Sequence, residues 1–425
     1  MVKAAPKIDQ SKYIILLGDG MGDYPISKLK NQTVLQSART PNMDFIAQHG
    51  LLGQVQTIPP SFTPGSDVAN LSILGYDPQA YYTGRAPLEA ASIGVSLAPS
   101  DVAFRCNFVT LECGKMKDFS AGHISTVEGR SLIQELDSRL GSTEFQFFCG
   151  TSYRHLLVWR GGQEHMLCTP PHDISGQAID GYFPNGPGAE QLLDLMIRSQ
   201  DVLRDHPVNQ HRTAEGNHAA NSIWLWGQGR APQLPSFQEK YGKSGAIISA
   251  VDLLKGIGRY LGLEVIEVPG ATGYLDTNYV GKADYALGAL LEHDFVYVHV
   301  EAPDEAGHNG DLKAKIQAVE DFDRLVVGTV LNKIVQFSSF RIMVLPDHLT
   351  PVSIRTHTSE PVPFAIFPGN AQVLHRQCAS LSPVSNGKQE ADKTVKQKRK
   401  FNEHDAQSGI FIPDGHTLMD FFLQE

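Results

Sequence analysis

The sequence has few cysteines and no long apolar run. Its five cysteines are odd in number, widely spaced and without a C-x-x-C pair, so neither a disulfide framework nor a cysteine zinc site is expected. No segment approaches the about eighteen consecutive apolar residues that a transmembrane helix needs, and residues 1–12 lack the apolar core of a signal peptide. We therefore expect reduced thiols in a cytoplasmic protein.

The sequence also lacks the loops that bind nucleotide phosphates. We find no P-loop and no kinase-type glycine loop. The Gly18-x-Gly20-x-Gly22 pattern misses the last step of G-x-G-x-x-G, and Asp19 inside it would repel a pyrophosphate. The net charge of −10 and the pI of about 5.9 argue against binding to nucleic acid or to an anionic membrane. An anionic substrate would need a local group of Arg, Lys or metal ions.

Three short apolar runs, each rich in β-branched or aromatic residues, predict a parallel sheet. They are Tyr13–Leu17, Phe295–Val300 and Phe340–Leu345. Each has the length of a strand and no Gly or Pro, which is typical of strands buried on both faces. Helical patterns follow at Thr40–His49 and Lys313–Lys333. Strands alternating with helices indicate an α/β fold.

The length of 425 residues favours two domains. The middle of the chain has strand-like segments of its own, at Val102–Leu111, His155–Trp159 and Ser222–Trp226. We expect residues 76–245 to form a second α/β domain, inserted into a domain made of 1–75 and 246–425. A polar stretch at 376–400 predicts a mobile surface loop, and we find no internal repeat.

Each of the three apolar runs is followed at once by residues that can bind metals. They are Asp19 after the first run, Asp304 and His308 after the second, and Asp347, His348 and His357 after the third. Taken singly, each could be a turn or packing residue, but the carboxyl ends of parallel strands meet at one edge of a sheet. Carboxylates mixed with neutral imidazoles suit Mn²⁺ or Zn²⁺ better than Ca²⁺ or Mg²⁺. Six such ligands exceed one tetrahedral site and predict two metals about 4 Å apart, the arrangement used for in-line displacement at phosphorus.

A serine opens a further helical pattern. Pro64-Gly65-Ser66-Asp67 precedes an apolar stretch that ends at Leu74. At the start of a helix, free N–H groups and the helix dipole favour a phosphate. Ser66 could be only an N-cap, and no Ser-His-Asp arrangement is evident. A metal ion can activate a serine hydroxyl directly, however, so we predict Ser66 as nucleophile.

Seven segments carry the motifs of a known family. They are Asp19–Asp23, Thr40–Asp44, Pro64–Asn70, Leu74–Pro78, Tyr82–Ala90, Ala103–Asn107 and Asp304–His308. Together they resemble the archaeal-type cofactor-independent phosphoglycerate mutases of the alkaline-phosphatase superfamily. The similarity runs from about Lys12 to Gly369 and resumes at Phe401–Leu423. Details at Val68–Asn70 and Tyr24-Pro25 look closest to a bacterial branch that has also been proposed to act as homoserine kinase.

The resemblance implies an alkaline-phosphatase-like, mainly parallel sheet flanked by helices, with an inserted α/β domain. It implies two divalent metals, Mn²⁺ before Zn²⁺ or Mg²⁺, and no need for 2,3-bisphosphoglycerate. One metal site would take Asp304, His308 and His357, and the other Asp19, Ser66, Asp347 and His348. The substrate-binding residues matched by short patterns are His123, Arg105, Arg154 and Lys255. The 376–400 stretch departs from the compact family pattern, but it lies outside every motif.

The expected function is interconversion of 3-phosphoglycerate and 2-phosphoglycerate through a phosphorylated Ser66. Glycerate would reorient while the inserted domain excludes water, and His123 or Asp67 would act as general acid. A phosphomonoesterase would need no closing domain, and a homoserine kinase would take its phosphoryl group from a nucleoside triphosphate. A non-catalytic metal-binding protein would not need the serine. The expected partner is a small phosphorylated substrate, and the oligomeric state stays open.

Overall fold

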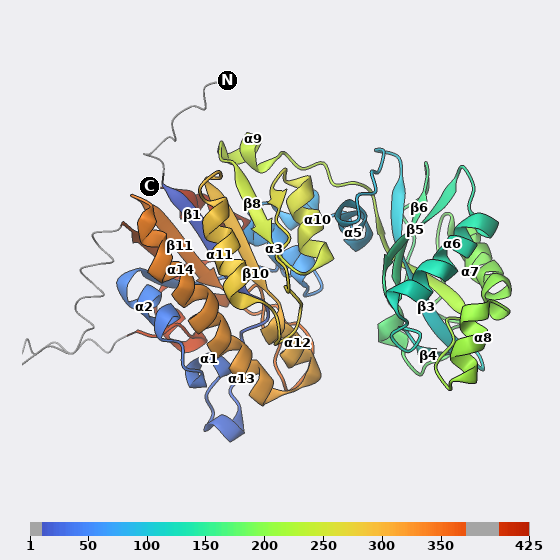
Figure 1. Ribbon diagram of the computed structural model, residues 1–425, viewed down its shortest axis with the longest axis horizontal. Helices are drawn as coiled ribbons and strands as arrows, with labels where there is room; N and C mark the ends of the chain where they lie inside the picture. Colours follow the sequence, from blue (N-terminus) through green and yellow to red (C-terminus); the bar gives the residue numbers. More distant parts are fainter. Residues whose placement is uncertain (1–10, 371–398, 425) are drawn as a thin grey trace, which may run out of the picture. The chain divides into compact units, whose positions relative to one another are not determined.

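A computed structural model of the chain, which describes residues 11–370 and 399–424, contains two compact units (Figure 1). Thr83–Leu234 forms unit 2, and the described residues on either side of it form unit 1. The expected boundaries at 75/76 and 245/246 differ from this division, because Lys240 and Tyr241 hydrogen-bond the carbonyl of Gly75. Of the polar stretch 376–400, all but the last two residues lie outside the described residues.

Unit 1 is built on an eight-stranded sheet. Its strands are β1 (Lys12–Gly18), β2 (Leu51–Val55), β8 (Gly245–Ile248), β9 (Glu264–Val265), β10 (Phe295–Val300), β11 (Phe340–Leu345), β12 (Val362–Gly369) and β13 (Ile410–Ile412). Their order is β13-β2-β12-β11-β1-β10-β8-β9. All neighbours are parallel except the two pairs that β12 makes, with β11 and with β2. The three apolar runs predicted as strands therefore lie side by side at the centre.

The central strands end in register. Gly18 lies opposite Val300, and Leu17 lies opposite Leu345, so β1, β10 and β11 finish at the same edge. Every residue of β10 is buried, as is every residue of β1 after the first. Ile14 and Leu16 pack in the large core cluster of unit 1. Because the intervening residues point to the opposite face and are also buried, both faces of the sheet are covered.

Helices cover this sheet. They are α1 (Val34–Ser37), α2 (Pro41–His49), α3 (Ser66–Ile73), α4 (Pro78–Tyr81), α9 (Phe237–Tyr241), α10 (Asp252–Tyr260), α11 (Tyr279–Ala289), α12 (Ala302–Asn309), α13 (Leu312–Asp321), α14 (Gly328–Lys333), α16 (Glu403–Ala406) and α17 (Leu418–Leu423). For example, α11 packs on β10 (Figure 1), and α2 packs on β12. In the described residues, no helix is both long enough and apolar enough to cross a bilayer.

The helix predicted at 313–333 contains a π-helical turn, Phe322–Val327, between α13 and α14. This turn carries the buried Asp323 against the first turn of α2. The Asp323 carboxylate accepts hydrogen bonds from the backbone N–H groups of Asn42 and Met43, at 3.3 and 2.7 Å. The change of helix type thus supplies an anion to a helix N-terminus, a favourable position for negative charge.

Unit 2 has an antiparallel sheet with helices. Its strands are β3 (Val102–Glu112), β4 (Lys115–Asp118), β5 (Phe145–Thr151), β6 (Arg154–Trp159) and β7 (Ser222–Gly229), and its helices are α5 (Arg85–Ser92), α6 (Thr126–Leu140), α7 (Ala189–Arg204) and α8 (Pro207–Ala214). The central strand β3 pairs with β6, β7 and β4. Helix α6 packs on β5 and α7 on β7. Strands and helices in both units confirm the α/β class expected from the sequence.

Candidate active site

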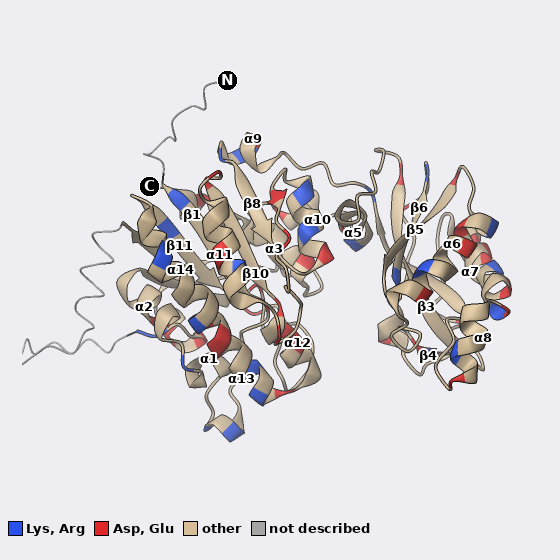
Figure 2. Cartoon of the chain, in the orientation of Figure 1, with Lys and Arg blue, Asp and Glu red and all other residues tan. Residues whose placement is uncertain are grey.

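The carboxyl edge of the unit 1 sheet gathers acidic and imidazole side chains. Asp19 directly follows β1, Asp304 lies in the first turn of α12, and Asp347 follows β11 after Pro346; Figure 2 shows the acidic residues on α12. The ligand atoms form two groups, each within 4.8 Å. The groups are Asp304, His348 and His357, and Asp19, Asp347 and His348. His348 belongs to both groups and so lies between them.

His308 lies beside the first group. Its Nε2 atom is 2.8 Å from Nε2 of His357 and 3.2 Å from Oδ2 of Asp304. All six metal-binding side chains expected from the sequence therefore come together. Their division between two ions stays a prediction, and the geometry adds His348 to the Asp304 and His357 group.

The imidazoles are oriented as metal ligands usually are. Nδ1 of His308 donates to the carbonyl of Arg355 at 3.0 Å, and Nδ1 of His348 lies 3.2 Å from the hydroxyl of Thr350. A hydrogen bond at Nδ1 leaves Nε2 free to offer its lone pair, as is common around bound metals. Burial lowers the pKa of His348 to about 4, so its ring is neutral near pH 7, as metal binding requires.

One carboxylate oxygen in the site has no hydrogen-bond partner within the described residues. It is Oδ1 of Asp19, which is completely buried, whereas Oδ2 lies 2.9 Å from Nε2 of His299. Burial, followed by the charges of Asp347 and Asp304, raises the pKa of Asp19 well above its usual range. A cation beside Oδ1 would satisfy this atom and relieve the repulsion, so the residues present fit a bound divalent metal.

In the group that contains Asp304 and His357, the pKa of the carboxylate is shifted in the opposite direction. Burial disfavours the charged form of Asp304, but hydrogen bonds from His308 and His357 hold its pKa well below the usual range. Burial likewise opposes protonation of His308, yet Asp304 raises the pKa of His308 to about 9. Without a metal, a proton on this imidazole thus compensates the carboxylate. Metal binding here must displace that proton.

Ser66 is the first residue of α3 and lies within this cluster. Its Oγ atom is 3.0 Å from Nε2 of His348, and the residue is 9% exposed. The N-cap of α3 is Gly65, so the interpretation of Ser66 as only an N-cap is wrong. Gly65 has an extended φ of −177°, and a Cβ there would lie 2.7 Å from the Asp67 carboxylate.

Comparisons with known proteins identify the family. A family model described as 2,3-bisphosphoglycerate-independent phosphoglycerate mutase matches residues 47–209. A probable mutase of this name from Geobacter sulfurreducens is 52% identical over 97% of this chain and 99% of its own. The mutase of Methanosarcina acetivorans is 59% identical over 84% of this chain and 90% of its own. The chain belongs to this mutase family. The resemblance stated from the sequence is confirmed.

Solved structures agree with this assignment. The cofactor-independent phosphoglycerate mutase of Thermoplasma acidophilum has a TM-score of 0.63 and 29% identity, over 98% of this chain and 99% of its own. The PH0037 protein of Pyrococcus horikoshii has a TM-score of 0.78 and 30% identity, over 97% of each chain. The mutase fold therefore extends over both units.

The loop after β1, which contains Asp19, needs a glycine at position 20 in this mutase-family chain. Gly20 has a φ of +61°, in the left-handed region that favours glycine. A Cβ at Gly20 would lie 2.6 Å from both Oδ1 of Asp304 and Oγ1 of Thr350. The loop after β1 therefore packs directly against a ligand carried by α12.

Sequence reasoning missed the residues that hold the ligands. Asn70 donates from Nδ2 to the Ser66 carbonyl at 2.8 Å and to Oδ2 of Asp347 at 2.9 Å. Tyr297 donates to Oδ1 of Asn70 at 2.5 Å. Asn70 thus connects the helix that begins with Ser66 to Asp347. The signal in the sequence was a polar residue inside a helical stretch, which does not identify a partner elsewhere in the chain.

Three of the expected substrate-binding residues lie near one another in unit 2. Arg105 on β3 is buried, and its Cζ lies 4.2 Å from the centre of the Trp226 ring. Arg154 and His123 both lie near Tyr153. Cζ of Arg154 is 5.6 Å from the centre of the Tyr153 ring, and the centre of the His123 ring is 6.0 Å from it. The charges of Arg105 and Arg154 interact.

The other two candidate positions lie in unit 1. Lys255 of α10 places Nζ 2.8 Å from both carboxylate oxygens of Glu267, so a substrate would compete with this carboxylate. Asp67, one of the two general-acid candidates, accepts a hydrogen bond from the Tyr82 hydroxyl at 2.6 Å.

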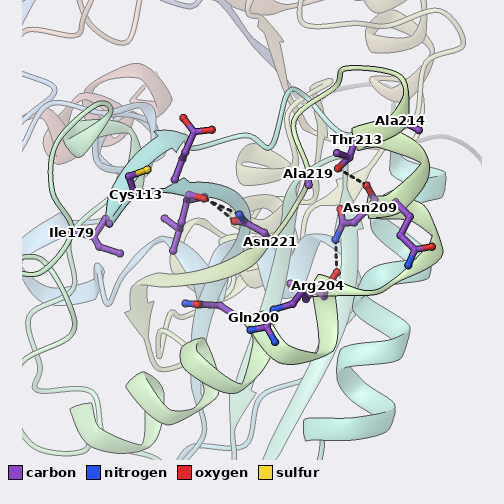
Figure 3. A pocket seen from close by; sticks show the side chains of 14 residues that line it. Cys113, Ile179, Gln200, Arg204, Asn209, Thr213, Ala214, Ala219 and Asn221 are labelled. Atoms are coloured by element: carbon purple, nitrogen blue, oxygen red, sulfur yellow. Dashed lines mark hydrogen bonds between the residues drawn. The ribbon is translucent and has the colours of Figure 1, made fainter.

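Unit 2 also has an open pocket that is separate from these candidates. It has a volume of about 790 Å³ and is lined by residues such as Cys113, Gln200, Arg204, Asn209 and Asn221 (Figure 3). The Nδ2 group of Asn209 donates to the carbonyls of Leu203 and Ala220, so this amide is engaged within the fold. None of the side chains expected to bind metal or substrate lines the pocket.

Proposed function

We propose that this protein interconverts 3-phosphoglycerate and 2-phosphoglycerate without 2,3-bisphosphoglycerate, using Ser66 as the phosphoryl carrier. The observation that carries this proposal is the position of the Ser66 hydroxyl, 3.0 Å from the imidazole shared by the two ligand groups. Membership of the mutase family supports the choice of substrate. We retain the cytoplasm as the expected location.

In the first half of the reaction, Ser66 Oγ loses its proton and attacks phosphorus in line. The bond from phosphorus to the C3 oxygen of the substrate breaks, and the leaving glycerate oxygen takes a proton. In the second half, the C2 hydroxyl loses its proton and attacks the phosphorus of the phosphoserine. The bond from phosphorus to Ser66 Oγ breaks, and Oγ takes a proton, which restores Ser66. No water and no nucleotide is consumed.

The chain supplies several parts of this chemistry. The N-terminus of α3 places Ser66 where backbone N–H groups and the helix dipole favour the negative charge of a phosphoryl group. Divalent cations held by the two ligand groups would activate the serine hydroxyl and neutralise charge on the phosphoryl oxygens. We propose Mn²⁺, because carboxylate and imidazole ligands are combined. Asp67, next in the chain and hydrogen-bonded to Tyr82, or His123 would exchange protons with glycerate.

Unit 2 carries a cationic cluster that we assign to the substrate carboxylate. Arg105 pairs with Glu89 at 3.0 Å, and Arg85 lies 3.9 Å from the other oxygen of that carboxylate. Burial, and then the like charges of Arg85 and Arg154, lower the pKa of Arg105 despite Glu89. The indole N–H of Trp226 is buried and has no hydrogen-bond partner within the described part of the chain. Glu89 pairs with Arg105 and lies near Arg85, and the charge of Arg154 also acts on Arg105. An anion would be stabilised by these guanidinium groups.

Replacing Arg105 with methionine should raise KM for 3-phosphoglycerate by roughly 10- to 100-fold, the expected cost of losing a hydrogen bond to a charged group. Steady-state kinetics on the folded variant measure the effect. Arg230→Met is the matched control, because Arg230 of unit 2 also pairs with a glutamate, Glu164, at 2.8 Å. Equal KM values for the two variants would contradict the assignment of the cluster.

A coupled assay tests the overall proposal. Purified protein with Mn²⁺ and 3-phosphoglycerate, coupled to enolase, should show turnover on the order of 1–1,000 s⁻¹. Parallel reactions contain homoserine with ATP, and a simple phosphomonoester alone. ATP-dependent phosphorylation of homoserine without mutase turnover would replace the proposal by a kinase. Phosphate release without isomerisation would replace it by a phosphomonoesterase.

A further inference from the structure

A lysine side chain is completely buried between the loops that carry the metal ligands. Lys315, on α13, has no exposed surface. Its ammonium group donates to the carbonyl of Gly22 at 2.8 Å, to the carbonyl of Thr350 at 2.7 Å and to Oδ2 of Asp23 at 3.0 Å. An ammonium has three donors, and each of them has an acceptor here.

These acceptors belong to two different ligand loops. Gly22 and Asp23 lie in the loop after β1, which begins with Asp19. Thr350 lies in the loop after β11, which contains Asp347. The same ammonium therefore holds both loops from a third element, α13, which follows the helix that carries Asp304 and His308.

Thr350 connects Lys315 to two of the proposed metal ligands. Its carbonyl accepts from Lys315, whereas its hydroxyl contacts the Asp304 carboxylate and lies 3.2 Å from Nδ1 of His348. In the other loop, the backbone N–H of Gly20 donates to Oδ1 of Asp347 at 3.1 Å. A displacement of either loop would thus move ligand atoms of both groups.

Stability alone does not account for this ion pair. The side chains of Lys315 and Asp23 are both completely buried, and the desolvation of such a pair often offsets its mutual attraction. A buried positive charge near two divalent cations is also electrostatically unfavourable for the cations. A role in fixing geometry is consistent with both features.

We propose that Lys315 is a positioning residue whose ammonium group fixes the spacing of the two ligand loops and thereby sets the affinity of both metal positions. The inference rests on the metal sites of the proposed function. It predicts the opposite sign from simple electrostatics: removal of a nearby positive charge would strengthen the binding of a cation, whereas loss of loop geometry weakens it.

The test compares Mn²⁺ binding to purified wild-type protein, Lys315→Met and the double variant Lys315→Met with Asp23→Asn. Equilibrium dialysis with Mn²⁺ alone gives Kd and the number of ions per chain, and thermal unfolding gives Tm. We expect Lys315→Met to lower Tm and to weaken Mn²⁺ binding by about 10- to 100-fold, as for other residues that support metal ligands. In the double variant, Tm should recover because no unpaired buried charge is left, whereas Mn²⁺ binding should stay weak.

Lys240→Met is the matched control. Lys240 also lies in unit 1 and donates to a backbone carbonyl, that of Gly75, and its removal changes the net charge by the same amount. Mn²⁺ binding to this variant should equal that of the wild type. Wild-type Mn²⁺ affinity in the double variant, with or without recovery of Tm, would overturn the inference. A wild-type protein that binds no Mn²⁺ would instead overturn the proposed metal sites, and the inference with them.

Discussion

Replacement of Ser66 by alanine is expected to reduce mutase turnover by at least about 10⁴-fold, because the reaction then has no phosphoryl carrier. Metal content should stay close to that of the wild type, since the Ser66 hydroxyl is hydrogen-bonded to His348, and His348 is also held by Thr350. Turnover is measured by the enolase-coupled assay and metal content by elemental analysis of the same sample.

Ser72→Ala is the control for this experiment. Ser72 lies on the same helix, is 1% exposed, and its hydroxyl has no hydrogen-bond partner among the described residues. The control should keep nearly wild-type turnover. Acid-quenched wild-type protein incubated with substrate should also contain phosphoserine, which the Ser66 variant should lack. Residual turnover near the wild-type level in Ser66→Ala would exclude the phosphoserine route.

Removal of metal by a chelator should abolish activity and lower Tm by roughly 10 °C. Bound ions stabilise the folded state when their free concentration is far above Kd, and the chelator removes this stabilisation. The physical reason is the cluster of Asp19, Asp304 and Asp347. Their buried carboxylates repel one another unless a cation or a proton neutralises the negative charge. The raised pKa of Asp19 reflects this repulsion, after burial itself. Thermal unfolding of the chelated protein with and without added Mn²⁺ measures the shift.

Elemental analysis of active protein completes this prediction. Two ions per chain are expected, and Asp304→Asn should retain one of them, because the second group of ligands does not contain this residue. Activity should return on addition of Mn²⁺ to the chelated wild type. Full turnover in metal-free protein would contradict the assignment of the ligands.

The sequence predicted the centre of the site because strand patterns and ligand chemistry coincide there. Three apolar runs, each followed by an Asp residue, were enough to place Asp19, Asp304 and Asp347 at one edge, and β1, β10 and β11 are neighbours in register. This inference needed only the length of the runs and the general behaviour of parallel sheets.

The supporting contacts could not be predicted in this way. Lys315 lies within the helical pattern of 313–333, where a lysine usually points into solvent, and its acceptors come from two distant loops. His299 lies inside an apolar strand run, although it contacts Asp19. Each of these roles depends on which elements meet in space, and periodicity along the chain carries no such information.

The domain boundaries illustrate the same point. The change of sequence character near residue 75 suggested a boundary there, but Tyr76 stacks edge-on with Tyr241 at 6.4 Å. The aromatic contact keeps both chain segments in unit 1. The chain leaves unit 1 only after Tyr82 and returns at Pro235.

The split of unit 1 around unit 2 affects how the chain is made. Within the described part of the chain, strand β1 pairs only with β10 and β11, which emerge from the ribosome long after unit 2 is complete. Unit 2 is contiguous and can fold during synthesis. The apolar Tyr13–Leu17 segment, in contrast, stays without its partner strands until they are synthesised. Such a strand is exposed to aggregation during that interval, so the nascent protein should depend on chaperone binding to this segment until β10 and β11 have emerged.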